Sequence, residues 1–152
     1  MRFIKMTAAA IALALFGTFS ANAGDTMDSR QLVKLPKDIE SKMLINMRDH
    51  IAALDDIIAA VQEEEFDKAG QIAESRLGWS SLVRRGDREV AKHWAAPMQK
   101  MADQMYRASS NFVIIAQDAS VEDSKESYKT VMGAIQKITA ACRGCHEVFR
   151  VR

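Results

Sequence analysis

The chain has 152 residues, of which 48% are hydrophobic and 27% are charged, and its formal net charge is +1. This length supports one domain with a real core. The near balance of charge argues against nucleic acid as a partner, because nucleic-acid-binding domains carry a clear excess of Lys and Arg.

The first 23 residues have the pattern of a secretory signal peptide. Arg2 and Lys5 form a short positive region, residues 8–16 are apolar, and Ala21-Asn22-Ala23 is a small-residue cleavage site. The apolar stretch is far shorter than the roughly 20 residues that cross a bilayer, which weighs against the alternative of a retained anchor. We therefore predict a periplasmic, soluble protein that does not span the membrane. Cleavage after Ala23 leaves 129 residues, with 19 basic and 20 acidic side chains.

Residues 24–35 are polar and irregular, which predicts a flexible leader ahead of one domain over residues 36–152. A first helix is expected from Pro36 to Val61, because proline is favoured at a helix start. Its apolar residues recur every three or four positions: Ile39, Met43, Met47, His50, Ile51, Leu54, Ile58 and Val61.

A second helix is expected from Asp67 to Leu77, with Gly78 as its cap. Residues 80–96 are predicted to be a long connection. A third helix is expected to begin near Pro97, with one face made of Met98, Met101, Met105, Ala108, Phe112 and Ile115. Its methionines are interpreted as core packing, since methionine fills irregular cores.

A fourth helix is expected to begin near Ser120, with Asp123 as its capping partner. Its apolar positions alternate at intervals of three and four, which is the seam of a helix in an antiparallel bundle: Tyr128, Val131, Ile135, Ile138, Cys142, Cys145 and Phe149. The predicted fold class is therefore all-α, an antiparallel four-helix bundle.

The run Cys142-Arg143-Gly144-Cys145-His146 is a Cys-x-x-Cys-His motif, the attachment sequence for a c-type haem. The two thiols add across the two vinyl groups of one porphyrin, and the adjacent imidazole binds the iron. Three alternatives explain the motif less well. A thioredoxin-like redox pair needs a strand-helix-strand pattern that the sequence lacks, and a zinc site needs a second pair of Cys or His ligands, whereas the other histidines are solitary. A plain disulfide gives the adjoining His146 no role. The seam places all three residues on the inward face, so one haem c is expected inside the bundle.

A secreted four-helix chain with a C-terminal Cys-x-x-Cys-His resembles the class II c-type cytochromes, the cytochrome c′ family. The resemblance implies that Cys142 and Cys145 carry the thioethers and that His146 is the proximal iron ligand. It further implies that Arg150 packs beside the proximal imidazole, and Trp94 is similar to an aromatic residue found before the third helix. It also implies protein redox partners and a homodimer formed through the first two helices.

The sixth iron position decides between functions within this family. Alignment of Pro36 with the proline that opens the first helix puts Met47 at the facing position, as in the low-spin branch, where a methionine binds the iron. Met43, His50 or no ligand remain alternatives. Candidate partners of the haem propionates are basic side chains: Arg48, Arg76, Arg84, Arg85 and Lys92.

The sequence thus predicts a periplasmic cytochrome that carries single electrons and has no catalytic residues. The first alternative is a five-coordinate cytochrome c′-type protein that binds small gases such as NO or CO. A second alternative is peroxidase-like turnover, which needs an open iron site and a distal acid–base residue, for which His50 is the candidate.

Overall fold

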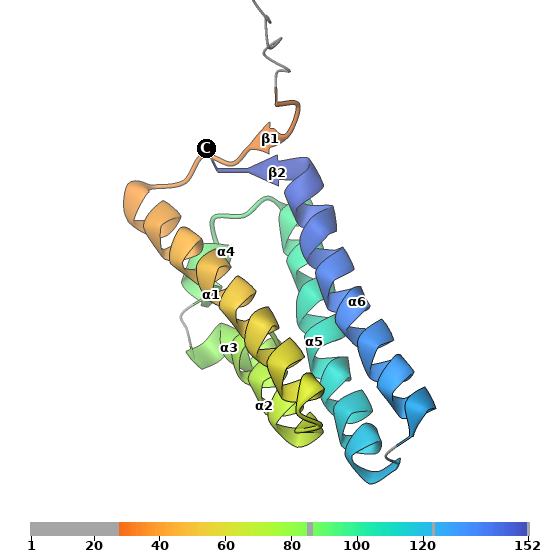
Figure 1. The fold of residues 1–152 in the computed structure, drawn as a ribbon. Helices are drawn as coiled ribbons and strands as arrows, with labels where there is room; N and C mark the ends of the chain where they lie inside the picture. Colours follow the sequence, from red (N-terminus) through yellow and green to blue (C-terminus); the bar gives the residue numbers. More distant parts are fainter. Residues whose placement is uncertain (1–27, 85–86, 123, 152) are drawn as a thin grey trace, which may run out of the picture.

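The computed structural model describes residues 28–84, 87–122 and 124–151, so the predicted signal peptide lies outside the described residues. The described chain is all-α, as predicted, apart from two short strands (Figure 1). In chain order the elements are β1 (Gln31–Leu32), α1 (Lys37–Gln62), α2 (Phe66–Arg76), α3 (Trp79–Arg84), α4 (Asp87–Ala91), α5 (Ala96–Glu122), α6 (Lys125–Val148) and β2 (Phe149–Arg150).

The long helices pack in sequence, α1 against α2, α2 against α5 and α5 against α6. At the end of the molecule that carries β1 and β2, α1 and α6 stand on opposite sides of α5 (Figure 1). The other end holds the α1–α2 and α5–α6 turns. We call these the strand end and the turn end.

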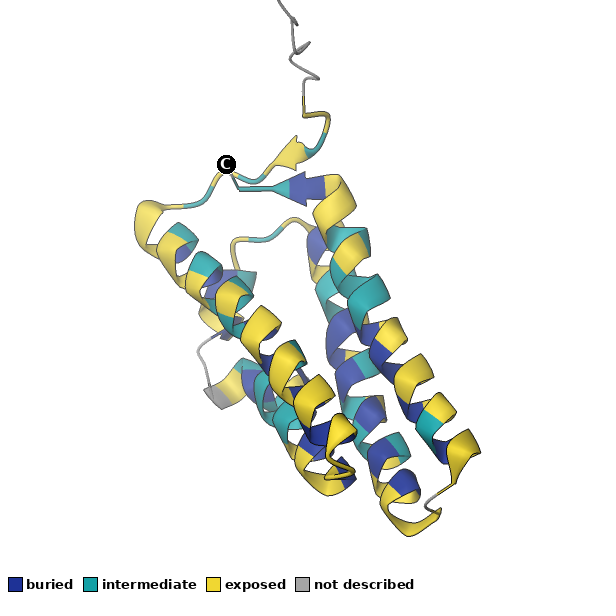
Figure 2. Ribbon diagram, viewed as in Figure 1, coloured by how far each residue is buried: buried dark blue, intermediate teal, exposed yellow. Residues whose placement is uncertain are grey.

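The main core lies toward the turn end, where the inward faces of the helices are buried (Figure 2). Ile57, Phe112 and Ile138 are fully buried there. Small residues let the helices approach closely: a Cβ on Gly70 of α2 would lie 3.6 Å from the Ala116 Cβ of α5. A second, smaller cluster lies at the strand end, made of Ile39, Met43, Val90, Met98 and Phe149.

The bounds of α1 agree with the predicted first helix, but its predicted buried face is partly wrong. Ile51 is 69% exposed and Ile58 is also exposed. The positions that meet α2 and the core are instead Ala53, Ile57 and Ala60. Alanine carries little hydrophobic signal, so the periodicity in the sequence favoured the larger isoleucines nearby.

Two other predictions at helix ends need correction. Residues 80–96 are not one long connection, because α3 and α4 form within them. The last helix does not begin near Ser120, which lies inside α5. It begins after Ser124, whose hydroxyl oxygen accepts a hydrogen bond from the Ser127 backbone N–H, while the Ser124 backbone N–H donates to the Ser127 hydroxyl oxygen. Asp123 lies outside the described residues.

The described part of the leader, predicted to be flexible, forms β1 instead. It pairs in parallel with β2, with Gln31 opposite Phe149 and Leu32 opposite Arg150. The Val33 N–H extends the pairing through a 2.8 Å bond to the Arg150 carbonyl. The leader is therefore tied to the segment that follows the Cys-x-x-Cys-His motif.

A search of the described helices for one long and apolar enough to cross a membrane found none.

Candidate functional site

A cavity of about 520 Å³ opens between α1, α5 and α6 at the strand end. Its volume lies within the range of roughly 300–1,000 Å³ typical of ligand sites in proteins. Its walls are mainly apolar and rich in methionine, and a few polar groups stand among them.

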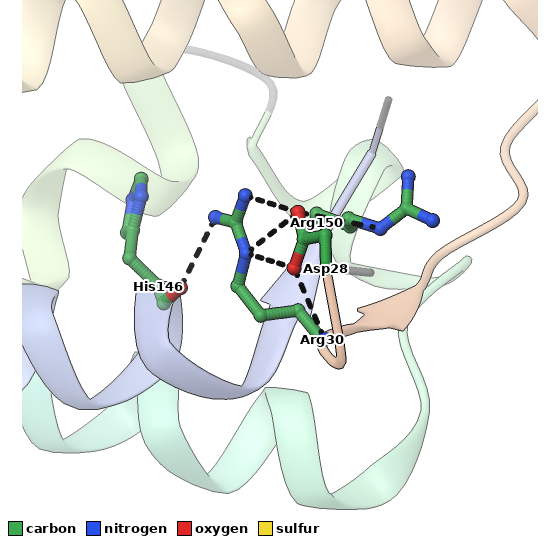
Figure 3. A network of polar contacts seen from close by, with 4 residues as sticks. All are labelled: Asp28, Arg30, His146 and Arg150. Carbon is green, nitrogen blue, oxygen red and sulfur yellow. Dashed lines mark hydrogen bonds and ion pairs between the residues drawn. The ribbon is translucent and has the colours of Figure 1, made fainter. Parts of the chain in front are cut away.

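The α6 wall of the cavity carries Cys142, Cys145 and His146. Positions 142, 145 and 146 face the same way because residues three and four apart lie on one side of a helix. Both cysteines are half-buried free thiols, and burial raises the pKa of each. Both therefore remain protonated at neutral pH. The imidazole of His146 projects from the end of α6 (Figure 3), and no hydrogen bond from a described residue engages it.

The α1 wall carries Met43, Met47 and His50 on successive turns. Met43 is buried and Met47 is half-buried. His50 is only 8% exposed, and its Nε2 has no hydrogen-bond partner among the described residues. Burial lowers the pKa of His50 to about 4, with smaller effects of Arg76 and His146 in the same direction. The imidazole of His50 is therefore neutral at pH 7, which is the form that binds a metal.

The α5 wall is a stripe of thioethers, with Met98, Met101 and Met105 all lining the cavity. The sequence predicts that this stripe packs around the edge of the porphyrin and does not bind the iron, and in the structure the stripe forms part of the cavity surface. Trp94, just before α5, lines the same cavity, and its Nε1 is buried without a hydrogen-bond partner in the part of the chain described.

Apolar side chains that a folded protein normally covers are exposed in the cavity. Ile51 is among its lining residues although 69% of the side chain is exposed. Contiguous exposed apolar surface of this kind marks a ligand or partner site. A large, flat, mainly apolar group suits these walls.

Arginines from three parts of the chain reach the cavity: Arg30 of the leader, Arg48 of α1 and Arg150 of β2. Among the predicted propionate partners whose side chains are described, only Arg48 lines the cavity. Arg76 is held instead by Asp49, with its Nη2 2.7 Å from Oδ1, and by Asp56. Lys92 pairs with Glu89 at 2.7 Å. The Arg84 side chain and Arg85 lie outside the described part.

Arg150 lies near the motif but does not contact the His146 imidazole in the way that the family resemblance implies. Its guanidinium points away from that ring (Figure 3), and its Nε lies 3.6 Å from Asp28 Oδ2. The contact to His146 comes from Arg30, whose Nη1 donates to the His146 carbonyl oxygen at 3.3 Å. Sequence reasoning missed Arg30, because nothing in the sequence links residues 28–30 to residue 146.

The residues present fit a covalently attached haem. Two thiols and an imidazole stand on one wall of the mainly apolar cavity of about 520 Å³. Thioethers stand on the other walls, together with a buried imidazole whose Nε2 has no hydrogen-bond partner among the described residues. Histidine, methionine and cysteine are the side chains that hold haem in cytochromes. The side chains available to hold the group and the apolar lining of the cavity thus suit the same ligand.

No protein-family model, curated protein or solved structure matches the chain. The motif and the cavity are therefore the two features of this chain that bear on its function.

Proposed function

We propose that this protein is a secreted class II c-type cytochrome that carries single electrons between protein redox partners in the periplasm. The observation that carries the proposal is the joint placement of Cys142, Cys145 and His146 on the wall of a 520 Å³ cavity that Met47 also lines. The antiparallel four-helix bundle and the single haem c are parts of the same proposal.

In this proposal the two thiols hold the porphyrin and His146 holds the iron. Cys142 and Cys145 would each hold the porphyrin by adding the thiol S–H across a vinyl double bond, an addition that needs no oxidant. The three residues lie within a single helical turn, which keeps both anchors and the axial ligand rigid relative to one another.

Met47 of α1 is the proposed sixth ligand. When bound, the haem supplies a one-electron couple, and a thioether ligand raises its reduction potential. Met47 and His146 come from different helices, α1 and α6, and both line the same cavity. Two fixed axial side chains suit electron transfer, because the ligands need to move little between oxidation states.

The matched variants Met47→Ala and Met101→Ala test this assignment. Both remove a half-buried thioether from the same cavity, but Met101 lies on α5. We expect the reduced Met47→Ala protein to lose the sharp, separated visible bands of a low-spin iron, whereas Met101→Ala retains them. Retention of those bands in Met47→Ala, together with their loss in His50→Leu, would assign the sixth position to His50 instead.

A five-coordinate, gas-binding protein is the second candidate, and the polar atoms near Met47 favour it. A recess of about 10 Å³, lined by Met47, His50 and Trp94 among others, adjoins the main cavity. The unpartnered His50 Nε2 and Trp94 Nε1 are polar groups able to contact a small ligand there. A broad, high-spin spectrum of the wild-type protein that changes on addition of CO would support this candidate and exclude the electron carrier with Met47 bound.

A further inference from the structure

In the last turn of α6, the backbone carbonyl group of His146, the proposed iron ligand, has no hydrogen-bond partner within the helix. The helix ends at Val148, two residues after His146, so its last carbonyl groups have no partner within the helix. The Phe149 N–H satisfies the Cys145 carbonyl. The next carbonyl, that of His146, accepts its hydrogen bond from the leader, through Arg30 Nη1 at 3.3 Å (Figure 3).

Arg30 is held firmly in this position by Asp28. The carboxylate accepts from Arg30 Nε at 2.9 Å and from Nη2 at 2.6 Å, and its Oδ1 also accepts from the Arg30 backbone N–H at 3.1 Å. A two-point pair of this kind fixes the plane of the guanidinium. Hydrogen bonds from Arg30 lower the pKa of Asp28 to about 2, so the carboxylate is charged at any ordinary pH.

The backbone next to Arg30 is fixed as well, because β1 pairs with β2 in the register Gln31 to Phe149. The segment that directly follows Arg30 thus lies beside the segment that follows the axial histidine. A cation at a helix C-terminus also interacts favourably with the partial negative charge of the last carbonyls.

We propose that Arg30, locked by Asp28, is a positioning residue for His146: the leader caps the last turn of α6 and so fixes the orientation of the axial imidazole. The effect on the iron rests on the proposed function. The cap itself, which is the hydrogen bond from Arg30 to the His146 carbonyl, does not. Groups that orient a metal ligand from outside its coordination sphere tune the metal, which gives the cap a measurable consequence.

The test compares Arg30→Gln with Arg88→Gln in the haem-loaded, oxidised protein. Each variant removes one positive charge, but Arg88 is an exposed residue of α4 that does not line the cavity. We expect the hyperfine-shifted resonances of the haem methyl groups in proton NMR spectra, whose spread reports the orientation of the His146 ring, to move in Arg30→Gln alone. Resonances that stay in place in Arg30→Gln, as they do in Arg88→Gln, would overturn the positioning role, even if both variants change the reduction potential through charge.

Hydrogen exchange in the same variants tests the cap without reference to iron. In Arg30→Gln we expect exchange at the Phe149 and Val33 amides to rise about two- to five-fold, the loss expected for a charged helix cap. Arg30→Lys is expected to recover part of the protection from exchange, since it keeps the positive charge but loses the two-point pairing of the guanidinium with Asp28. Unchanged exchange in Arg30→Gln would overturn the cap.

These two measurements separate the inference from the proposed function. A wild-type protein without haem overturns the proposed function and with it the positioning role, while the exchange comparison still decides whether the cap exists. A haem-loaded protein with identical NMR and exchange behaviour in all variants overturns the inference and leaves the proposed function standing.

Discussion

The turn end and the strand end of the molecule are built from the same long helices but are packed differently. At the turn end, Ile57, Phe112 and Ile138 are fully buried in one apolar cluster between the helices. At the strand end, methionines, His50 and the motif surround a cavity of about 520 Å³. The turn end supplies the stability that permits the strand end to remain open, because an unfilled apolar cavity costs stability.

The largest expected effect is at the turn end. Phe112→Ala removes a fully buried ring from the core, so we expect a loss of about 3–5 kcal/mol in the free energy of unfolding. Met101→Ala at the strand end should cost less than half as much, because that side chain already borders open space. Urea unfolding of the haem-free proteins measures both, and equal losses would contradict the distinction between the two ends.

The strand end is expected to make the haem-free protein sensitive to mild acid. Burial lowers the pKa of His50 from 6.5 to about 4, so between these values the unfolded chain binds a proton that the folded chain does not. Stability is therefore lost as pH falls from about 6.5 to about 4, by at most about 3 kcal/mol. His50→Leu should remove this loss, whereas the exposed-histidine control His93→Gln should retain it. Acid profiles of unfolding that coincide for all three proteins would exclude His50 as the cause.

A smaller effect is expected at a helix end near the turns. The Tyr128 hydroxyl of α6 donates to the Val61 carbonyl in the last turn of α1, and its ring packs edge-on against Phe66 with centroids 5.3 Å apart. Tyr128→Phe keeps the ring and removes the hydroxyl, so we expect a loss of about 1 kcal/mol. Thermal unfolding measures this change. A loss as large as that of Phe112→Ala would mean that the ring contact is also disturbed.

The sequence was most informative where the signal was local. The long helices follow from apolar spacing within one segment, and the motif at residues 142–146 needs only its own five residues. The buried alanines of α1 and the strand β1 were missed. The alanines lack a strong hydrophobic signal, and β1 depends on a partner more than a hundred residues away in sequence.

The same distinction applies to the site. Cys142 and Cys145 were identified from the motif, Met47 from the resemblance to the class II cytochromes, and His50 as its alternative one turn later. The structure brings all four to one cavity. Arg30 was not identified, because its contact with residue 146 exists only after the leader has paired with β2. Side chains that act across the fold need the tertiary structure to be recognised.

The most direct test of the central claim is the intact mass of the denatured protein after export from cells that attach haem. We predict the mass of the chain from Gly24 plus one haem group. For the double variant Cys142→Ser/Cys145→Ser we predict the mass of the variant polypeptide alone. A wild-type chain that carries no added mass, produced beside a control cytochrome that does, would contradict it.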